Sequence, residues 1–346
     1  MTRITNIPNL EGYGVFVDDI DFKNLSRQEW MDLGKLHMKK LVMIIRKTGL
    51  DKKSFHQVIK KWGKSRQNYA ATLFAKYPWA EGNFRKVLTS PDVDKHDKDI
   101  IKEYWKIGGC NYKQGNILRV AEENGLFGSG ELLWHSNESG DIAFTPAVAL
   151  MGEHGMCNSA TGFMVTTPYY YSVSDSIRSE LDEMILTHDF QTGKINVEDE
   201  NLFLYKNMCP EPTEIPLVIQ SPAGIKGLHY SFNTVTGIKG MSNLEAKKVL
   251  SEIRKGLDPY TYDYWWENND DLLIFDNSIV QHRRLGDTTN RLCHRYQFDY
   301  TYLQYKVTKQ NYIPYFQEPY RSKYVYKMNI IGSMLKHEGI SFPVFV

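Results

Sequence analysis

Residues that could bind a metal ion stand in two short segments that are far apart along the chain. His135 and Asn137 lie two residues apart in the first segment, and His282 lies in the second. Side chains at positions i and i+2 of a β-strand point to the same side of a sheet, so His135 and Asn137 could face one metal ion. A mononuclear iron that activates O2 uses three protein ligands on one face, typically two imidazoles and a carboxylate, and keeps its other positions for a chelating co-substrate and O2. The spacing therefore predicts an iron site with an asparagine where a carboxylate is expected.

Two arginines follow the second histidine at a regular spacing. Arg291 comes nine residues after His282, and Arg295 comes four residues later. If this segment is a strand, Arg291, Cys293 and Arg295 point to one side of it. A guanidinium group on that side could hold the far carboxylate of a dicarboxylate while the 2-oxo-acid end chelates the metal. Either histidine taken singly is better explained as a structural residue, but the joint spacing with the arginines favours a metal site.

Residues 1–65 predict a helix, a strand and a second helix. Ser26 and Glu29 form a capping box, which starts a helix. Residues 41–45 (Leu-Val-Met-Ile-Ile) are rich in β-branched side chains and too short for a helix, so they predict a buried strand. After Asp51, apolar residues at i, i+3, i+4 and i+7 predict a helix with one buried stripe, formed by Phe55, Val58, Ile59 and Trp62.

Later segments predict two more helices among many short strands. One amphipathic helix is indicated by Ile177, Leu181, Met184 and Ile185, and a second begins at Ser242 with Gly256 placed to end it. Short segments rich in β-forming residues occur at 142–150, 162–167, 217–220, 272–275 and 295–302. Because few helices separate these strands, an antiparallel barrel or jelly roll is favoured over a parallel sheet. The expected fold class is α+β, mainly β.

The composition indicates a folded chain with a small-molecule partner. Among 346 residues, 42 are Lys or Arg and 41 are Asp or Glu, so no global field is available to recruit nucleic acid or an anionic membrane. Apolar runs fall well short of the roughly 20 residues needed to cross a bilayer. The start of the sequence lacks the apolar stretch of a secretory signal. The four cysteines are scattered without Cys-x-x-Cys spacing, which favours reduced thiols and a cytoplasmic location.

The chain is expected to form one domain over residues 1–346. No linker or shift in composition divides it, and aromatic residues at 13% argue against disorder. Residues 188–215 include several acidic residues, together with Gly193 and Pro210. They predict either an excursion over the mouth of the barrel, as a lid, or an ordinary surface insertion.

Over nearly its whole length the chain resembles the taurine dioxygenase (TauD/TfdA-like) family of Fe(II)/2-oxoglutarate oxygenases. Residues 134–137 (Trp-His-Ser-Asn) stand where that family has Trp-His-x-Asp, and residues 160–163 (Ala-Thr-Gly-Phe) resemble its Gly-Asp-Thr-x-Phe stretch. Residues 221–228 resemble a strand turn of the family, and residues 276–282 resemble the segment that ends in its Gln-His pair.

The resemblance implies a double-stranded β-helix, or jelly roll, with flanking helices, and it implies Fe(II), 2-oxoglutarate and O2 as cofactor and co-substrates. It assigns three residues to the metal site: His135, Asn137 and His282. It assigns Thr161 and Arg291 to the C5 carboxylate of 2-oxoglutarate, and Arg295 to the co-substrate or to an anionic group of the substrate. The implied reaction is hydroxylation or a related C–H oxidation of a small polar metabolite, with 2-oxoglutarate converted to succinate and CO2. A homo-oligomer is compatible with this assignment.

Asn137 is the main departure from the family pattern, because an asparagine offers a neutral oxygen that does not offset the charge of iron. Asn137 could still be a ligand, or water or a halide could fill its position, as in related radical halogenases. Glu138 could bind instead, but neighbouring residues of a strand face opposite sides, so this would need a bulge. Hydroxylation, halogenation, desaturation and ring closure therefore stay open, as does a non-catalytic relative that only binds a ligand.

Overall fold

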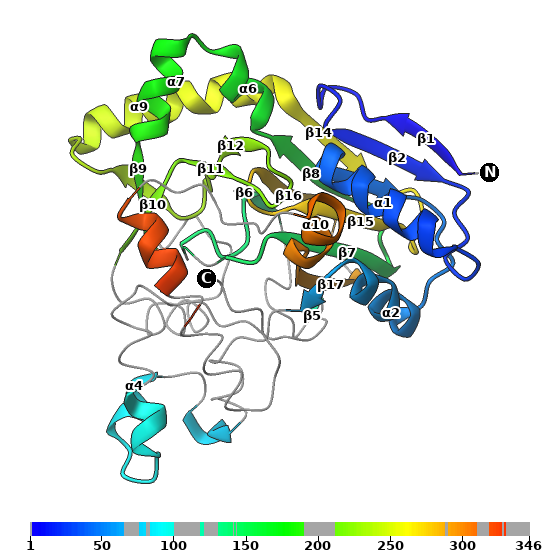
Figure 1. Cartoon of the computed structure of the whole chain (residues 1–346), viewed down its shortest axis with the longest axis horizontal. Helices are drawn as coiled ribbons and strands as arrows, with labels where there is room; N and C mark the ends of the chain where they lie inside the picture. Colours follow the sequence, from blue (N-terminus) through cyan, green and yellow to red (C-terminus); the bar gives the residue numbers. More distant parts are fainter. Residues whose placement is uncertain are drawn as a thin grey trace.

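The computed structural model describes residues 2–65, 76–80, 84–99, 118–120, 131–140, 142, 144–189, 212–287, 290–309, 318–326 and 329. Within these residues the chain has a mixed α/β fold with mostly antiparallel strands, in agreement with the predicted fold class. Helices lie on the outer sides of two sheets (Figure 1).

The larger sheet contains β1 (Arg3–Asn6), β2 (Gly14–Asp18), β3 (Val42–Ile45), β4 (Lys64–Ser65), β5 (Leu118–Val120), β7 (Ala147–His154), β15 (Leu272–Asp276) and β17 (Leu292–Asp299). The strand order is β1-β2-β3-β15-β7-β17-β4, and β5 also pairs with β17. Only β2 and β3 are parallel neighbours among these described strands. Because β3 lies beside β15, the N-terminal residues form part of the same sheet as the C-terminal strands.

The smaller sheet consists, in order, of β14 (Thr261–Trp265), β8 (Ser159–Val165), β16 (Val280–Gly286) and β6 (Leu132–His135). An apolar core lies between the two sheets. Leu150 and Phe275 enter it from the larger sheet, and Phe163 and Val280 enter it from the smaller one. The two sheets therefore pack face to face, with one side of each turned inward.

Two short sheets extend this arrangement. The first has the order β10 (Thr213–Pro216), β9 (Ile185–His188), β13 (Val235–Ile238), and the second is the hairpin of β11 (Val218–Gln220) and β12 (Lys226–Leu228). Most of the predicted excursion at 188–215 lies outside the described residues. Its two ends belong to the antiparallel pair β9 and β10.

The helices form an outer layer on each side of the facing sheets (Figure 1). On the larger sheet, α1 (Arg27–Lys40), α2 (Lys52–Trp62) and α10 (Thr301–Thr308) bury a second apolar core that includes Phe55, Tyr296 and Phe298. On the other side, α6 (Thr167–Ser172), α7 (Asp175–Glu183) and α9 (Asn243–Leu257) contribute to a third core around Met164. Shorter helices are η1 (Pro78–Ala80), α4 (Phe84–Thr89) and η2 (Asp258–Tyr260).

The predicted helix starts and the predicted N-terminal strand are confirmed. Ser26 caps α1 and Ser242 caps α9, each in a complete capping box. The strand predicted at 41–45 is β3, which is fully buried. The predicted apolar stripe is the buried side of α2.

The prediction that Gly256 ends its helix is wrong, because α9 continues to Leu257. A Cβ atom at Gly256 would lie 2.1 Å from Cε2 of Tyr169. The glycine therefore serves close packing against α6 and not chain termination.

Two other predicted ends are also wrong. The helix predicted through Ile185 ends at Glu183, because Ile185 pairs with Pro216 in the first short sheet. The strand predicted at 295–302 ends at Asp299, and Thr301 begins α10. The helix ends where strand pairing with a later segment begins, and the strand ends where the next helix begins.

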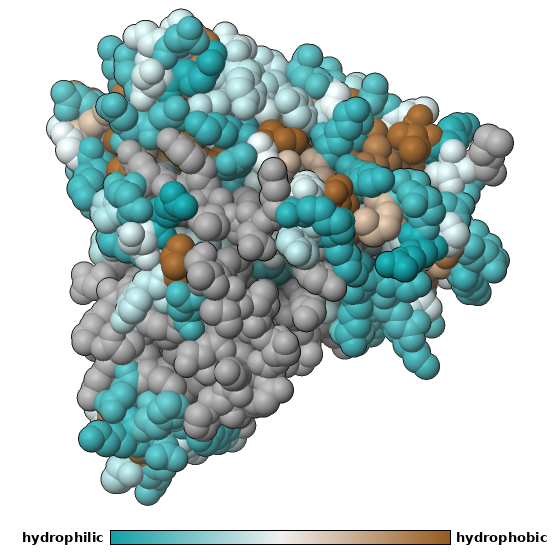
Figure 2. Space-filling view, in the orientation of Figure 1, coloured by the Kyte–Doolittle hydropathy of each residue, from teal (hydrophilic) through white to brown (hydrophobic). Residues whose placement is uncertain are grey.

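The described surface is mainly polar on the face shown in Figure 2, where hydrophobic residues form small separate groups. In the described ranges, no helix is long and apolar enough to cross a membrane.

Candidate metal centre

Two histidines from neighbouring strands of the smaller sheet lie beside each other. His135 is the last residue of β6, and His282 in β16 is its direct partner across the strands. Their ring centroids are 4.1 Å apart, and the His282 ring lies 4.8 Å from the ring of Phe275 in the larger sheet. The pair therefore faces the space between the sheets, where two imidazoles at this separation could share one metal ion.

The hydrogen bond of His135 fixes which of its ring nitrogens is free. His135 Nδ1 lies 2.7 Å from the backbone carbonyl oxygen of Leu133. A carbonyl oxygen only accepts, so Nδ1 carries the hydrogen and Nε2 of the neutral ring carries the lone pair. His282 Nδ1 is buried and has no hydrogen-bond partner among the described residues. Each ring therefore keeps a nitrogen that can serve a metal.

Both imidazoles are held in the neutral form. Burial lowers the pKa of His135 to about 4, and the charges of Arg295 and Arg284 act in the same direction. Burial also holds the pKa of His282 well below its usual value, helped by the charges of His135 and Arg295. A metal ion binds the unprotonated ring, so protons compete little for this pair at neutral pH.

Asn137 lies in the turn after β6 and not on the strand itself, so the expected strand alternation of residues 135 and 137 is wrong in detail. The side chain of Asn277 forms two hydrogen bonds with the backbone of Asn137. The Asn137 N–H donates to Oδ1 of Asn277 at 2.8 Å, and Nδ2 of Asn277 donates to the Asn137 carbonyl oxygen at 2.9 Å. Asn137 is buried, and its Nδ2 has no hydrogen-bond partner among the described residues. Its amide is therefore left to interact with a bound group.

Glu138 is engaged elsewhere in the fold. It adopts the left-handed conformation, with φ of 63°. Its Oε2 accepts from the backbone N–H of Thr145 at 2.7 Å, and its Oε1 accepts from Nε2 of Gln297 at 2.7 Å. In the described part of the chain, no cluster of three His, Cys, Asp or Glu side chains is placed to hold a metal ion. In this arrangement Glu138 does not supply the missing carboxylate.

The turn that carries Asn137 is tied to the second histidine segment by buried polar groups. The ring nitrogens of His229 lie 2.8 Å from the Ser278 carbonyl oxygen and 3.3 Å from the Ser139 carbonyl oxygen. Oγ of Ser139 lies 2.8 Å from Oγ1 of Thr234, which lies 2.9 Å from Nδ1 of His188. The His229 contacts join the turn at 137–140 to the turn between β15 and β16, and the Ser139 contact joins it to β9 through Thr234 and His188.

Thr161 and Arg291 are brought to the same region through Trp266. Trp266 Nε1 donates to Oγ1 of Thr161 at 3.0 Å, and the Arg291 guanidinium lies 6.0 Å from the Trp266 ring centroid. Arg291 is only 4% exposed, and its Nε and Nη1 atoms have no hydrogen-bond partner among the described residues. A buried guanidinium with unused donors is suited to binding a carboxylate.

Arg295 and Arg284 contribute positive charge beside the histidines. The charge of each arginine lowers the pKa of His135, after the larger effect of burial. Arg295 lies in β17 two residues after Cys293, which belongs to the core between the sheets. The strand alternation predicted for Cys293 and Arg295 therefore directs Arg295 to the inner side of the larger sheet.

Three residues of this region received no role from the sequence: Asn277, Trp266 and Arg284. Arg284 had a usable signal, since it lies two residues after His282 on one strand and so shares its side. The hydrogen bonds of Asn277 and Trp266 join segments that are more than 100 residues apart, which no local pattern reveals.

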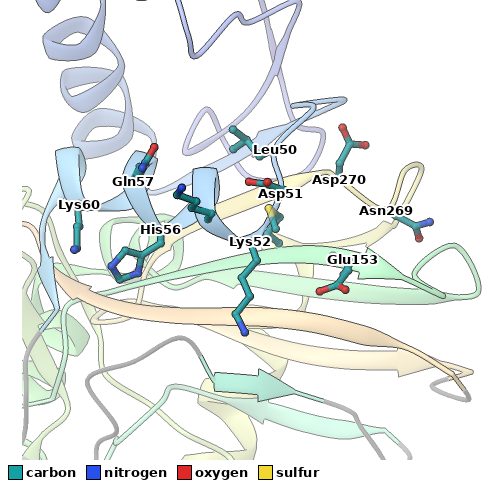
Figure 3. A pocket seen from close by; sticks show the side chains of 12 residues that line it. Leu50, Asp51, Lys52, His56, Gln57, Lys60, Glu153, Asn269 and Asp270 are labelled. Atoms are coloured by element: carbon teal, nitrogen blue, oxygen red, sulfur yellow. The ribbon is translucent and has the colours of Figure 1, made fainter.

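A separate cleft lies on the outer side of the larger sheet, against α2. Figure 3 shows Lys52, His56 and Lys60 projecting from this helix into the cleft, with Glu153 of β7 on the opposite wall. His56 packs edge-on against Tyr296, whose side chain belongs to the outer core, with ring centroids 5.3 Å apart. The cleft is therefore separated from His282 by the sheet, and the histidine pair is the better candidate for the chemistry.

Comparison with known proteins gives the family. Residues 113–297, more than half of the chain, match the family described as taurine catabolism dioxygenase TauD, TfdA family. No curated protein gives a significant sequence match. The solved structure of AAD-2 in complex with Mn(II) and N-oxalylglycine is 16% identical with a TM-score of 0.58, and the match covers 86% of this chain and 97% of that chain. A taurine dioxygenase from Burkholderia xenovorans is 16% identical with a TM-score of 0.56, covering 86% of this chain and 90% of that chain.

The chain belongs to the TauD, TfdA family. It is an Fe(II)/2-oxoglutarate-dependent dioxygenase, which uses Fe(II), 2-oxoglutarate and O2. The residues present fit these groups: the neutral pair of His135 and His282 suits the metal, and the unused donors of Arg291 suit a carboxylate. The resemblance of residues 134–137 to the family's Trp-His-x-Asp predicts a carboxylate at position 137, and this chain has asparagine there.

Proposed function

We propose that this dioxygenase oxidises a small polar metabolite at an iron held by His135, His282 and the position of Asn137, within a double-stranded β-helix made by the two facing sheets. The observation that carries this proposal is the pair of neutral imidazoles, with ring centroids 4.1 Å apart. When bound, iron(II) supplies O2-dependent C–H oxidation coupled to the conversion of 2-oxoglutarate to succinate and CO2. The near balance of charge over the chain favours a small molecule over a polymer as substrate.

Thr161 and Arg291 hold the C5 carboxylate of 2-oxoglutarate in this proposal. Trp266 supports both residues, because it donates to the Thr161 hydroxyl oxygen and lies beside the Arg291 guanidinium. The Thr161 hydroxyl therefore keeps its own hydrogen for a ligand oxygen. Arg295 binds the co-substrate or an anionic group of the substrate, since its charge acts on both histidines.

The third metal position has no carboxylate ligand in this proposal. Asn277 fixes the main chain of Asn137, and the contacts of Glu138 with Thr145 and Gln297 occupy its carboxylate. The position is therefore filled by the Asn137 amide oxygen, by water or by a halide. Without a carboxylate the metal site carries one more positive charge, which favours an anion beside the metal.

Anaerobic titration with Fe(II) and 2-oxoglutarate tests the proposed site without a known substrate. Chelation of the metal by the 2-oxo acid is expected to give a visible metal-to-ligand charge-transfer absorption in the wild type. Absence of this band in wild-type protein that remains folded would contradict the proposed function. A screen of metabolites for succinate formation, with added chloride and product mass spectrometry, then separates hydroxylation from halogenation.

Replacement of Asn137 by Asp tests the third position. A carboxylate beside two neutral imidazoles is expected to raise Fe(II) affinity at least about tenfold, or ~1.4 kcal/mol, because it offsets the metal charge. Asn137→Ala is the control, since it removes the amide without adding charge. Equal Fe(II) affinity in Asn137→Asp and Asn137→Ala, measured by anaerobic competition with a chelator, would place residue 137 away from the metal.

A further inference from the structure

Arg284 lies on the same side of β16 as His282. The strand alternates: His282 contacts His135 and Phe275 between the sheets, while Arg283 points to the outer side, where it pairs with Asp263. Arg284 is the next inward residue after His282, and it is 5% exposed.

The neighbours of Arg284 are the residues proposed to hold the co-substrate. Arg284 is the direct partner of Thr161 across β16 and β8. Oγ1 of Thr161 accepts from Trp266 at 3.0 Å, and Trp266 lies 6.0 Å from the Arg291 guanidinium. One hydroxyl and two guanidinium groups are thus gathered around one buried region. Directly opposite residues on neighbouring strands have Cβ atoms roughly 5 Å apart, so Thr161 and Arg284 can contact one ligand group.

The positive charges of Arg284 and Arg291 repel each other. Burial and, to a smaller extent, the charge of Arg291 lower the pKa of Arg284 to about 10. Burial also lowers the pKa of Arg291. A guanidinium group stays protonated in proteins, so two buried arginines give this region a positive potential. Such a region favours an anion that both guanidinium groups can reach.

We propose that Arg284 is a second guanidinium for the far carboxylate of the 2-oxo acid, acting together with Thr161 and Arg291. This inference rests on the proposed function, because it takes 2-oxoglutarate as the ligand of this region. It adds to that function a residue two positions after the metal-binding His282. The expected consequence is that the protein selects 2-oxo acids with a second carboxylate more strongly than one arginine alone would allow.

Calorimetric binding to the Mn(II)-loaded protein without turnover tests the role of Arg284. The two probes are 2-oxoglutarate and 2-oxopentanoate, which has the same chain length but lacks the far carboxylate. In the wild type, 2-oxoglutarate is expected to bind much more tightly. In Arg284→Met this preference is expected to fall roughly 10- to 100-fold, because a charged hydrogen-bond partner is lost, while affinity for 2-oxopentanoate changes little. Arg284→Lys is expected to recover part of the preference, since it keeps the charge but loses the planar fork.

Arg283→Met is the matched control, because Arg283 is the neighbouring arginine on the outer side of the same strand. It is expected to keep the wild-type preference, and thermal unfolding confirms that each variant is folded. If Arg284→Met keeps the full preference for 2-oxoglutarate, or weakens both probes equally, the role given to Arg284 is wrong while the proposed function stands. If the wild type binds neither 2-oxo acid with Mn(II), the proposed function fails and this inference fails with it.

Discussion

The two sides of the larger sheet carry positive charge in different ways. On the inner side, Arg291 is 4% exposed and has donors without a partner among the described residues. On the outer side, Lys52 and Lys60 are exposed along the cleft beside α2 (Figure 3). A buried guanidinium has lost its water and interacts strongly with an anion, whereas an exposed ammonium keeps its water and gains little. Both sides carry positive charge, but burial predicts a ligand site on the inner side and exposure predicts a solvated surface on the outer side.

The largest expected difference is in metal affinity, between a variant that lacks a histidine on the inner side and one that lacks a histidine on the outer side. His282→Ala takes away one of two imidazoles and should weaken Mn(II) or Fe(II) binding roughly 100- to 1000-fold. His56→Ala, in the outer cleft, should leave metal affinity unchanged. Metal titration under anaerobic conditions measures both variants. A similar loss in the two variants would show that the inner pair is not the metal site.

The next largest expected difference is in 2-oxoglutarate affinity, between a variant that lacks a buried arginine on the inner side and one that lacks an exposed lysine on the outer side. Arg291→Gln removes the guanidinium that is proposed to bind the 2-oxoglutarate carboxylate, so affinity for 2-oxoglutarate should fall about 30-fold or more. Lys60→Gln removes an exposed charge and should change that affinity by less than about twofold. Calorimetry with the Mn(II)-loaded protein provides the comparison. If Lys60 matters as much as Arg291, burial does not decide where the anion binds.

A third contrast concerns a buried histidine that has no ligand role. His37 lies in α1, 1% exposed, against Tyr300, and neither ring nitrogen has a hydrogen-bond partner among the described residues. Burial lowers its pKa to about 3, compared with 6.5 for a free histidine. As the pH falls below about 6.5, the unfolded chain takes up a proton that folded His37 does not, so stability is lost between about pH 6.5 and pH 3.

His37→Leu removes the titrating group and with it this loss of stability, so the variant should be more stable than the wild type at acidic pH. Its advantage is expected to grow by about 2 kcal/mol between pH 8 and pH 5, because one pH unit below the unfolded pKa corresponds to ~1.4 kcal/mol. Urea unfolding of metal-free protein at both pH values measures the change, and 2-oxoglutarate binding should be unaffected. A stability difference that is independent of pH would mean that His37 is not held neutral by burial.

The sequence predicts best those parts of the fold that depend on neighbouring residues. The capping boxes at Ser26 and Ser242 and the buried stripe of α2 are local features, so their signals can be read directly. The end of α9 could not be predicted from Gly256, because the reason for this glycine is the ring of Tyr169. Packing between distant segments overrides the local rule.

The same limit applies to the candidate site. Spacing alone identifies the histidine pair and Arg291 as residues of interest. It does not reveal that the Asn277 side chain hydrogen-bonds to the backbone of Asn137. Nor does it reveal that Thr145 and Gln297 donate hydrogen bonds to the carboxylate of Glu138. In the proposed site, these contacts leave the third metal position to Asn137, water or a halide. They depend on the way the two sheets pack, which only the folded structure provides.

The most direct test of the account is the linkage between metal and co-substrate on the inner side of the sheets. Affinity for 2-oxoglutarate is measured by calorimetry with and without Mn(II), in the wild type and in His282→Ala. If the histidine pair and the arginines form one site, Mn(II) should tighten 2-oxoglutarate binding at least about tenfold in the wild type and not in His282→Ala. Equal affinity with and without Mn(II) in the wild type would contradict the account, because the metal and the 2-oxo acid would then bind independently.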